Sequence, residues 1–228
     1  PDGSVVATSQ KVFRVFDGSE LANFEPFMSA NGVALGPLAF TADGKYLARI
    51  AFSGPSVLVD TQTWQIVSKY SLPIGELTRV AFSPDGRQLV TGDATGVLRL
   101  WTTDPFQPIA VLGKHKMAVQ AVAFSPDGTV LASGGAERLV RMWDIETGRL
   151  LRSLRGHTHD IRAIVYTPDG QTLATASEDR TIRLWNGKTG EPVKLLFTRY
   201  DHSVCSLSLS PDGLMLARGS HNKDIKIW

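Results

Sequence analysis

The chain has 228 residues, of which 43% are hydrophobic and 20% charged, and this is enough for a sizeable core. Its 24 Lys and Arg against 22 Asp and Glu leave a net charge of +2, too small a surplus to drive nucleic-acid binding by itself. The single cysteine, Cys205, excludes an intrachain disulfide framework and cysteine-rich metal sites, and no apolar run approaches the ~18 residues of a membrane-spanning helix.

A turn motif recurs six times along the chain, first as Pro1-Asp2-Gly3 and last as Ser210-Pro211-Asp212-Gly213. Proline presets φ, aspartate caps the backbone and glycine reaches positive φ, so each copy predicts a tight turn. Successive glycines of the motif are 41 to 43 residues apart; they are Gly3, Gly44, Gly86, Gly128, Gly170 and Gly213. A period of this length indicates a repeat architecture.

Short runs of alternating apolar residues lie between the turns. After the first turn we expect strands over residues 5–8 and 12–16. The most regular unit, residues 156–186, predicts three strands, and a fourth strand follows the unit in three successive periods. The three strands of the unit are expected over residues 161–166, 172–177 and 181–185. The fourth strands of the three periods are expected over residues 107–112, 149–154 and 192–197. Runs this short that are rich in β-branched and aromatic residues favour strands over helices.

A tryptophan stands in fixed phase, fifteen residues after four of the glycines, at Trp101, Trp143, Trp185 and Trp228. Four antiparallel strands in about 42 residues are typical of a β-propeller blade, where neighbouring blades bury both faces of each sheet. We therefore expect an all-β fold, a β-propeller of four-stranded antiparallel blades forming a single domain over residues 1–228. About six blades are represented, the first without its inner strand and the last without its outer strand.

The units at 113–144 and 156–186 resemble the WD-repeat (Trp-Asp) family, with Gly-His, then Ser-Pro-Asp-Gly or a variant, then Trp-Asp or Trp-Asn. The resemblance extends over essentially the whole chain. It implies a propeller that most often has seven blades, which would need roughly 294 residues. Two alternatives follow: a fragment of a larger propeller, which we favour, or six blades that close imperfectly. A fragment would expose strand edges and favour edge-mediated oligomers.

The resemblance also implies a hydrogen-bonded chain of four side chains in each complete blade. In the most regular unit these are His157, Thr175, Asp179 and Trp185. A buried indole N–H needs an acceptor, a hydroxyl can accept and donate, and an imidazole can link the hydroxyl to a carboxylate. Thr, His and Asp could also form a hydrolase triad, but a hydroxyl engaged with a tryptophan favours a structural role.

The other units depart from this pattern. Around Trp143 the pattern keeps His115 and Ser133, but Glu137 replaces the aspartate. Around Trp101 it keeps Thr91, with Thr95 at the aspartate position, and the first two units lose the tryptophan. We therefore expect one complete network, in the Trp185 blade, and the greatest rigidity there.

Propellers of the resembled family typically bind partners around the central channel, where the loops before the first strands meet the turns between the second and third strands. Transferring those positions by phase gives a set of candidate partner-binding residues. They are Phe52, Glu76, Thr78, Gln120, Asp160, Arg162, Glu178, Ser203 and His221. Small residues, a few charges and one aromatic residue favour a protein or peptide segment with a small apolar anchor near Phe52. The alternative is that these loops are simply solvated.

The resemblance therefore implies a non-enzymatic protein–protein interaction platform or assembly scaffold. The sequence has no glycine-rich phosphate loop, no His-Glu-x-x-His and no Cys/His ligand spacing, so we expect no catalytic residue, no metal and no cofactor. Nucleic acid and membranes are not expected as partners. A cytoplasmic location is expected. One alternative is a sensor or regulatory module whose catalytic domain lies outside this sequence. A more remote one is a ligand-binding or hydrolytic propeller.

Overall fold

The protein is built from β-strands in a computed structural model that describes residues 5–7, 11–14, 17–23, 35–41, 43–51, 56–70, 77–197, 203–220 and 224–228. Within these ranges there are 22 strands. They are β1 (Val5–Ala7), β2 (Lys11–Arg14), β3 (Glu20–Asn23), β4 (Leu35–Phe40), β5 (Tyr46–Ala51), β6 (Ser56–Asp60), β7 (Ile66–Tyr70), β8 (Leu77–Phe82), β9 (Gln88–Asp93), β10 (Val97–Thr103), β11 (Phe106–Lys114), β12 (Val119–Phe124), β13 (Val130–Gly135), β14 (Val140–Asp144), β15 (Leu150–Leu154), β16 (Ile161–Tyr166), β17 (Thr172–Ser177), β18 (Thr181–Asn186), β19 (Pro192–Phe197), β20 (Val204–Leu209), β21 (Leu216–Ser220) and β22 (Ile225–Ile227).

Consecutive strands pair antiparallel and form six sheets, which we call blades 1 to 6 in chain order. Blade 1 is β1–β3, blade 2 is β4–β7, blade 3 is β8–β11, blade 4 is β12–β15, blade 5 is β16–β19 and blade 6 is β20–β22. Blades 2 to 5 have four strands, while blades 1 and 6 have three among the described residues. The predicted all-β propeller with incomplete first and last blades is confirmed. That these blades belong to a larger propeller stays a prediction.

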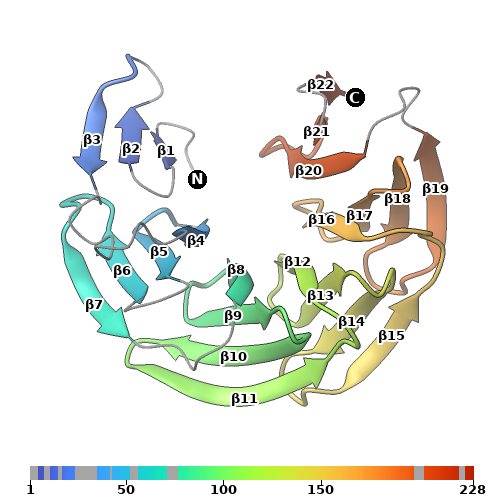
Figure 1. Cartoon of the computed structure of the whole chain (residues 1–228), viewed down its shortest axis with the longest axis horizontal. Helices are drawn as coiled ribbons and strands as arrows, with labels where there is room; N and C mark the ends of the chain where they lie inside the picture. Colours follow the sequence, from blue (N-terminus) through green and yellow to red (C-terminus); the bar gives the residue numbers. More distant parts are fainter. Residues whose placement is uncertain are drawn as a thin grey trace.

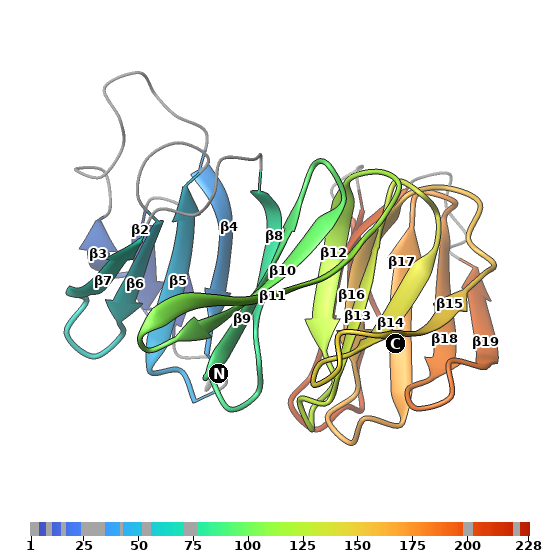
Figure 2. The same ribbon diagram turned by 90° about the horizontal axis from the view of Figure 1, so that it is seen from below.

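The blades are arranged side by side in an arc (Figure 1). The first strands of the four-stranded blades and of blade 6 (β4, β8, β12, β16 and β20) lie along the inner side of the arc, and the fourth strands lie along its outer side. Seen from the edge, the strands run between the two faces of the arc (Figure 2). The loops leading into the first strands therefore lie on one face, and the turns that follow those strands lie on the other.

The recurrent turn between the first and second strands explains the regularity of the blades. In blade 4, the Ser125 hydroxyl and the Thr129 N–H both donate to Oδ1 of Asp127, at 2.6 and 3.0 Å. Gly128 has φ of 74°, a left-handed conformation that glycine adopts without strain. The turn is thus closed by its own residues, which is why the motif predicts it from sequence.

The core lies between the blades. Blade 4 contributes Met142 and Leu154 and blade 5 contributes Leu173 and Trp185 to one apolar cluster, and all four are at most 5% exposed. Blades 2 and 3, and blades 3 and 4, pack in the same way through their own clusters. Each of blades 2 to 5 therefore buries one face against the blade before it and the other against the blade after it, as the apolar alternation requires.

Several strands differ from their expected bounds by one or two residues, and the fourth strand of blade 3 differs most in length. The sequence predicts the fourth strand of blade 3 over residues 107–112, but β11 extends over nine residues. Two register shifts, between Leu98 and Arg99 and between Leu100 and Trp101, let the β10–β11 hairpin curve along the outer side of the blade. The hairpin leaves Ile109 46% exposed and Val111 63% exposed.

Candidate functional site

The candidate partner-binding residues in the described ranges lie at the ends of the first strands of neighbouring blades. A register shift recurs at the start of β8, β12, β16 and β20, where one extra residue interrupts the pairing with the second strand. The extra residues are Thr78, Gln120, Arg162 and Cys205. Because a bulge changes the direction in which its side chain points, these four positions differ from the alternating positions around them.

Two of these side chains connect adjacent blades. The Thr78 hydroxyl of blade 3 donates to the carbonyl oxygen of Val119 in blade 4. The Gln120 side-chain amide of blade 4 donates to Oδ2 of Asp160, at 3.1 Å, in the loop before blade 5. Part of the candidate set therefore also holds the blades in register, a role that the sequence analysis did not assign to it.

The charges at the blade 5 end are paired with each other. The Arg162 guanidinium donates to Oε1 of Glu178 through Nε, at 2.8 Å, and through Nη2. The two side chains are 33% and 26% exposed, so the pair remains accessible to a partner. Arg79 of blade 3 donates to the Thr78 carbonyl. Burial is the main cause that lowers the pKa of Arg79, and the positive charge of Arg162 adds to it.

Cys205 and Ser203 complete the described part of the face in blade 6. The pKa of the Cys205 thiol is raised, mainly by burial. The charge of Glu178 also raises this pKa, whereas the charge of Arg162 opposes the shift. A raised pKa disfavours the thiolate, so this cysteine lacks the activation that a nucleophile needs. Three further candidates, Phe52, Glu76 and His221, lie outside the described residues.

The four side chains singled out in blade 5 form one hydrogen-bonded chain. The Trp185 indole N–H donates to Oγ1 of Thr175 at 2.9 Å, Thr175 is 2.8 Å from Nε2 of His157, and Nδ1 of His157 is 2.8 Å from Oδ2 of Asp179. Thr175 is 0% exposed. Its hydroxyl has no access to a substrate, so the arrangement is that of a structural network and not of a hydrolase triad.

Blade 4 holds a second complete chain, which corrects the expectation that only blade 5 has one. Trp143 donates to Ser133 at 2.7 Å, Ser133 lies 2.7 Å from Nε2 of His115, and Nδ1 of His115 lies 2.6 Å from Oε1 of Glu137. Glutamate is one methylene longer than aspartate, and it reaches the imidazole from the same turn. Its second oxygen accepts the N–H of Lys116, so the substitution is accommodated without loss of a link.

The protonation state of His115 follows from these contacts. Ser133 already accepts the Trp143 N–H, so its own hydroxyl can donate to Nε2, while Nδ1–H donates to Glu137. The neutral imidazole therefore satisfies every group. Burial, the largest influence, lowers the pKa of His115 below 6.5; Glu137 opposes this shift and Arg141 adds to it.

A pH dependence of stability follows. Because the folded-state pKa of His115 is below 6.5, the unfolded state binds more protons as the pH falls through 6.5, and the free energy of unfolding decreases. We expect urea unfolding at several pH values between about 7.5 and 5 to show this loss, and His115→Gln to remove it. His159→Gln, at an exposed position, is the matched control. Stability that rises on acidification in this range would contradict the prediction.

Blade 3 uses a different arrangement that the sequence analysis missed. Trp101 donates to Thr91 at 3.0 Å, as in the other blades. The acid of this blade is Asp93, two residues before the expected position, and it is 2% exposed. It accepts the N–H groups of Thr95 and Val97 and the Arg99 guanidinium. The polar Asp-Ala-Thr-Gly turn was a signal for this role, because aspartate often caps the turn that follows it.

Blades 2 and 6 place an arginine where the central blades have Ser or Thr. Arg49 and Arg218 are 3% and 1% exposed. Arg218 pairs with Asp224, at 3.3 Å, and lies over the Trp228 ring, 6.0 Å from its centroid. An arginine cannot accept an indole N–H, so blade 6 has an ion pair and a cation–π contact in place of the hydroxyl-centred chain.

Metal sites and membrane-spanning helices are absent from the described residues. In the described ranges no group of three or more His, Cys, Asp or Glu side chains is arranged to hold a metal ion. Over the same ranges, none of the elements is a helix of the length and hydropathy needed to cross a membrane.

Comparison with known proteins places the chain in a family. The family model described as "WD domain, G-beta repeat" matches residues 68–102, 106–144, 148–186 and 193–228. No curated protein sequence matches the chain. Each matched segment begins in or just before the fourth strand of one blade and ends at the third strand of the next, so the sequence repeat links adjacent blades. Propellers of this family generally mediate protein–protein interaction or scaffolding and are typically non-catalytic. Since the matched segments cover more than half of its length and are in phase with its blades, the chain belongs to the WD-repeat family of β-propellers.

Proposed function

We propose that the protein is a non-enzymatic interaction platform that binds a peptide or protein segment around the inner side of the arc. The binding face comprises the described candidates Thr78, Gln120, Asp160, Arg162, Glu178 and Ser203, together with Phe52, Glu76 and His221. In this proposal the partner segment places a small apolar anchor near Phe52, and Arg162 and Glu178 supply charge.

One observation carries the proposal. The bulge at the start of the first strand recurs in blades 3 to 6, yet the side chain it carries changes from Thr78 to Gln120, Arg162 and Cys205. The neighbouring first residues of these strands are uniformly aliphatic and buried, from Leu77 to Val204. A constant backbone with variable, half-exposed side chains is the arrangement expected of a surface that recognises a partner.

Exchange of the Arg162–Glu178 pair tests this face. The double variant Arg162→Glu/Glu178→Arg keeps an ion pair in blade 5, so its thermal unfolding should stay within roughly 2 °C of the wild type. We expect the variant to capture about tenfold less partner, or less still, in quantitative affinity capture. The positions of charges at the rim of an interface control both partner recognition and the rate of association.

Lys194→Glu, an exposed substitution on β19 of the same blade, is the control and should capture the wild-type set. Equal capture by the wild type and the exchanged pair, with both proteins folded, would contradict the proposal.

A further inference from the structure

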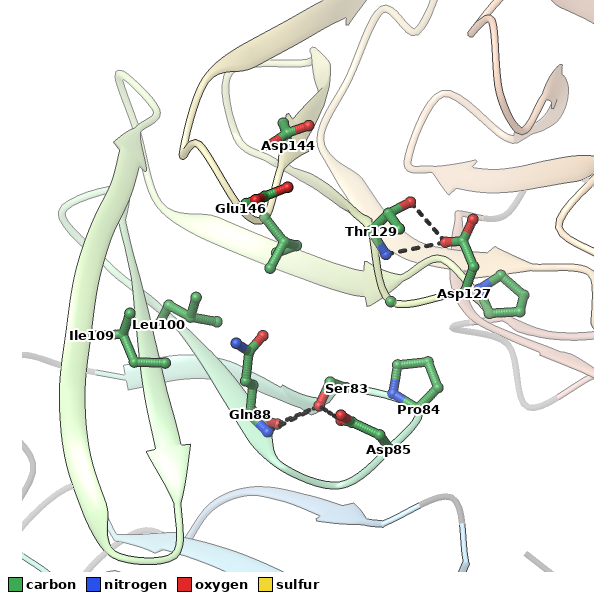
Figure 3. Close-up of a pocket in the computed structure, with 13 residues that line it drawn as sticks. Ser83, Pro84, Asp85, Gln88, Leu100, Ile109, Asp127, Thr129, Asp144 and Glu146 are labelled. Atoms are coloured by element: carbon green, nitrogen blue, oxygen red, sulfur yellow. Dashed lines mark hydrogen bonds between the residues drawn. The ribbon is translucent and has the colours of Figure 1, made fainter.

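A groove between blades 3 and 4 lies on the opposite face of the arc, away from the candidate residues described above. Its volume is about 830 Å³, and its walls come from two blades (Figure 3). Blade 3 contributes the turn at 83–85 together with Leu100 and Ile109. Blade 4 contributes the turn at 126–129 and the turn at 144–146. No described contact fills this space with another part of the chain.

The groove has an apolar part. Leu100 is 2% exposed, whereas Ile109 on the curved β11 strand is 46% exposed, and half-buried Ile145 faces them from blade 4. An isoleucine exposed to this extent beside a concave surface offers contact area to an incoming side chain. The volume lies within the ~300–1,000 Å³ typical of binding pockets.

The rim of the groove is acidic. Asp85, Asp127, Asp144 and Glu146 line it, and no Lys, Arg or His does, although the whole chain has a net charge of +2. Hydrogen bonds from Ser83, Ser125 and Thr147 are the largest influences that lower the pKa of the three aspartates, with Arg87 and Arg149 adding to the effect on Asp85 and Asp144. These lowered pKa values keep the three aspartates ionised at neutral pH.

Each rim aspartate retains an oxygen for a ligand. Asp85, Asp127 and Asp144 use Oδ1 to accept the hydrogen bonds of their turns. Their Oδ2 atoms make no hydrogen bond within the described part of the chain. The four carboxylates are not arranged to share one metal ion among the described residues, so separate basic groups suit them better than a single cation.

The neighbouring pair of blades, 4 and 5, lacks two of these four carboxylates. The turn aspartates recur in every blade, but Asp144 and Glu146 correspond to Asn186 and Lys188 in blade 5. In blade 5 the position of Ile145 is Gly187, where a Cβ atom would lie 2.1 Å from the carbonyl oxygen of Gly170. Blade 5 therefore lacks the isoleucine and two of the four carboxylates that line the groove in blade 4.

We propose that this groove binds a basic peptide segment of a protein partner, with one aliphatic side chain against Ile109 and Ile145 and flanking Lys or Arg side chains at the four carboxylates. Charge complementarity selects the flanking residues and the apolar surface selects the central one. Since the rim carboxylates are exposed, the affinity falls as the salt concentration rises.

The test uses a random peptide display library selected on the whole chain, followed by fluorescence anisotropy of the most enriched peptide. We expect enriched peptides to carry basic residues around an aliphatic one. The triple variant Asp85→Asn/Asp127→Asn/Glu146→Gln keeps the Oδ1 acceptors of the turns and should weaken the Kd by about tenfold or more. Ile109→Lys places a competing cation in the groove and should weaken binding similarly.

Asp169→Asn/Asp212→Asn is the matched control, because these aspartates accept the same turn hydrogen bonds in blades 5 and 6. It should bind the peptide within about twofold of the wild type. The exchanged pair Arg162→Glu/Glu178→Arg should also bind normally, because it alters the other face.

Several results would overturn the inference. They are the absence of enriched peptides, enrichment without basic residues, equal binding by the triple variant, or displacement of the peptide by Mg²⁺ or Ca²⁺ at a single site. If the Arg162→Glu/Glu178→Arg variant no longer binds the peptide, while the triple variant and Ile109→Lys still bind it, the groove inference fails. The proposed function of the other face then stands. Circular dichroism melts verify that each variant is folded.

Discussion

Replacing Trp185 with alanine lowers the free energy of unfolding by about 3–5 kcal/mol. The indole is 2% exposed and packs in the cluster between blades 4 and 5, with Met142 and Leu173. Its removal leaves a cavity at that interface. It also deprives Thr175 of the N–H that it accepts at 2.9 Å. Both losses act on the same blade, and the neighbouring blade loses part of its packing surface with it.

Urea unfolding followed by circular dichroism measures this effect, with Lys188→Ala at an exposed position as the control. Trp185→Phe separates the two contributions, since it keeps much of the apolar volume but removes the N–H donor. We expect Trp185→Phe to lower the free energy of unfolding by about 1–3 kcal/mol. A shift for Trp185→Ala no larger than that of Lys188→Ala would rule out a stabilising role for the network.

Replacing Asp93 with alanine lowers the free energy of unfolding by about 3–5 kcal/mol, because it leaves a half-buried guanidinium without its carboxylate. Oδ2 of Asp93 accepts Arg99 at 2.6 Å, and Oδ1 accepts the N–H groups of Thr95 and Val97 and the Thr95 hydroxyl. The aspartate side chain is 3% exposed, so water replaces few of these bonds. Asp93→Asn retains Oδ1 as an acceptor and should cost less.

The pH dependence of this effect has a defined sign. Burial raises the pKa of Asp93, but the hydrogen bonds from Thr95, Arg99 and Val97 outweigh it, and the net shift is below 3.8. A lowered folded-state pKa contributes stability that is present above 3.8 and lost as the pH falls through the folded value. The difference between the wild type and Asp93→Asn should therefore shrink in acid. A difference that grows on acidification would contradict this account of the carboxylate.

Much of the fold could be predicted because its signals are local. The turn at Ser125-Pro126-Asp127-Gly128 is closed by its own side chains and by one left-handed glycine, so four adjacent residues specify it. The alternating runs between such turns predict the strands, and β16, β17 and β19 have the expected bounds. The chain of His157, Thr175, Asp179 and Trp185 was also predictable, since all four lie at fixed offsets within one repeat.

The structure departs from prediction where the length of a side chain or the path of the backbone determines which residue completes a polar network. Glu137 completes the network of blade 4 because its extra methylene reaches His115, which residue identity at a fixed position does not reveal. Asp93 takes the role expected near Thr95 because the turn of blade 3 directs its N–H groups toward that carboxylate. Phe52, Glu76 and His221 lie outside the described residues, so that part of the candidate face rests on the sequence.

The sequence by itself determined the repeat, the strands, the turns and the blade 5 network, because each depends on residues within about 42 positions of one another. Only the tertiary structure decided which surfaces lie between blades. The acidic groove combines the Asp85 turn of blade 3 with Asp144 and Glu146 of blade 4, and its width depends on the path of β11 and on Ile145. Such a surface arises from the packing of two repeats, and no single repeat contains it.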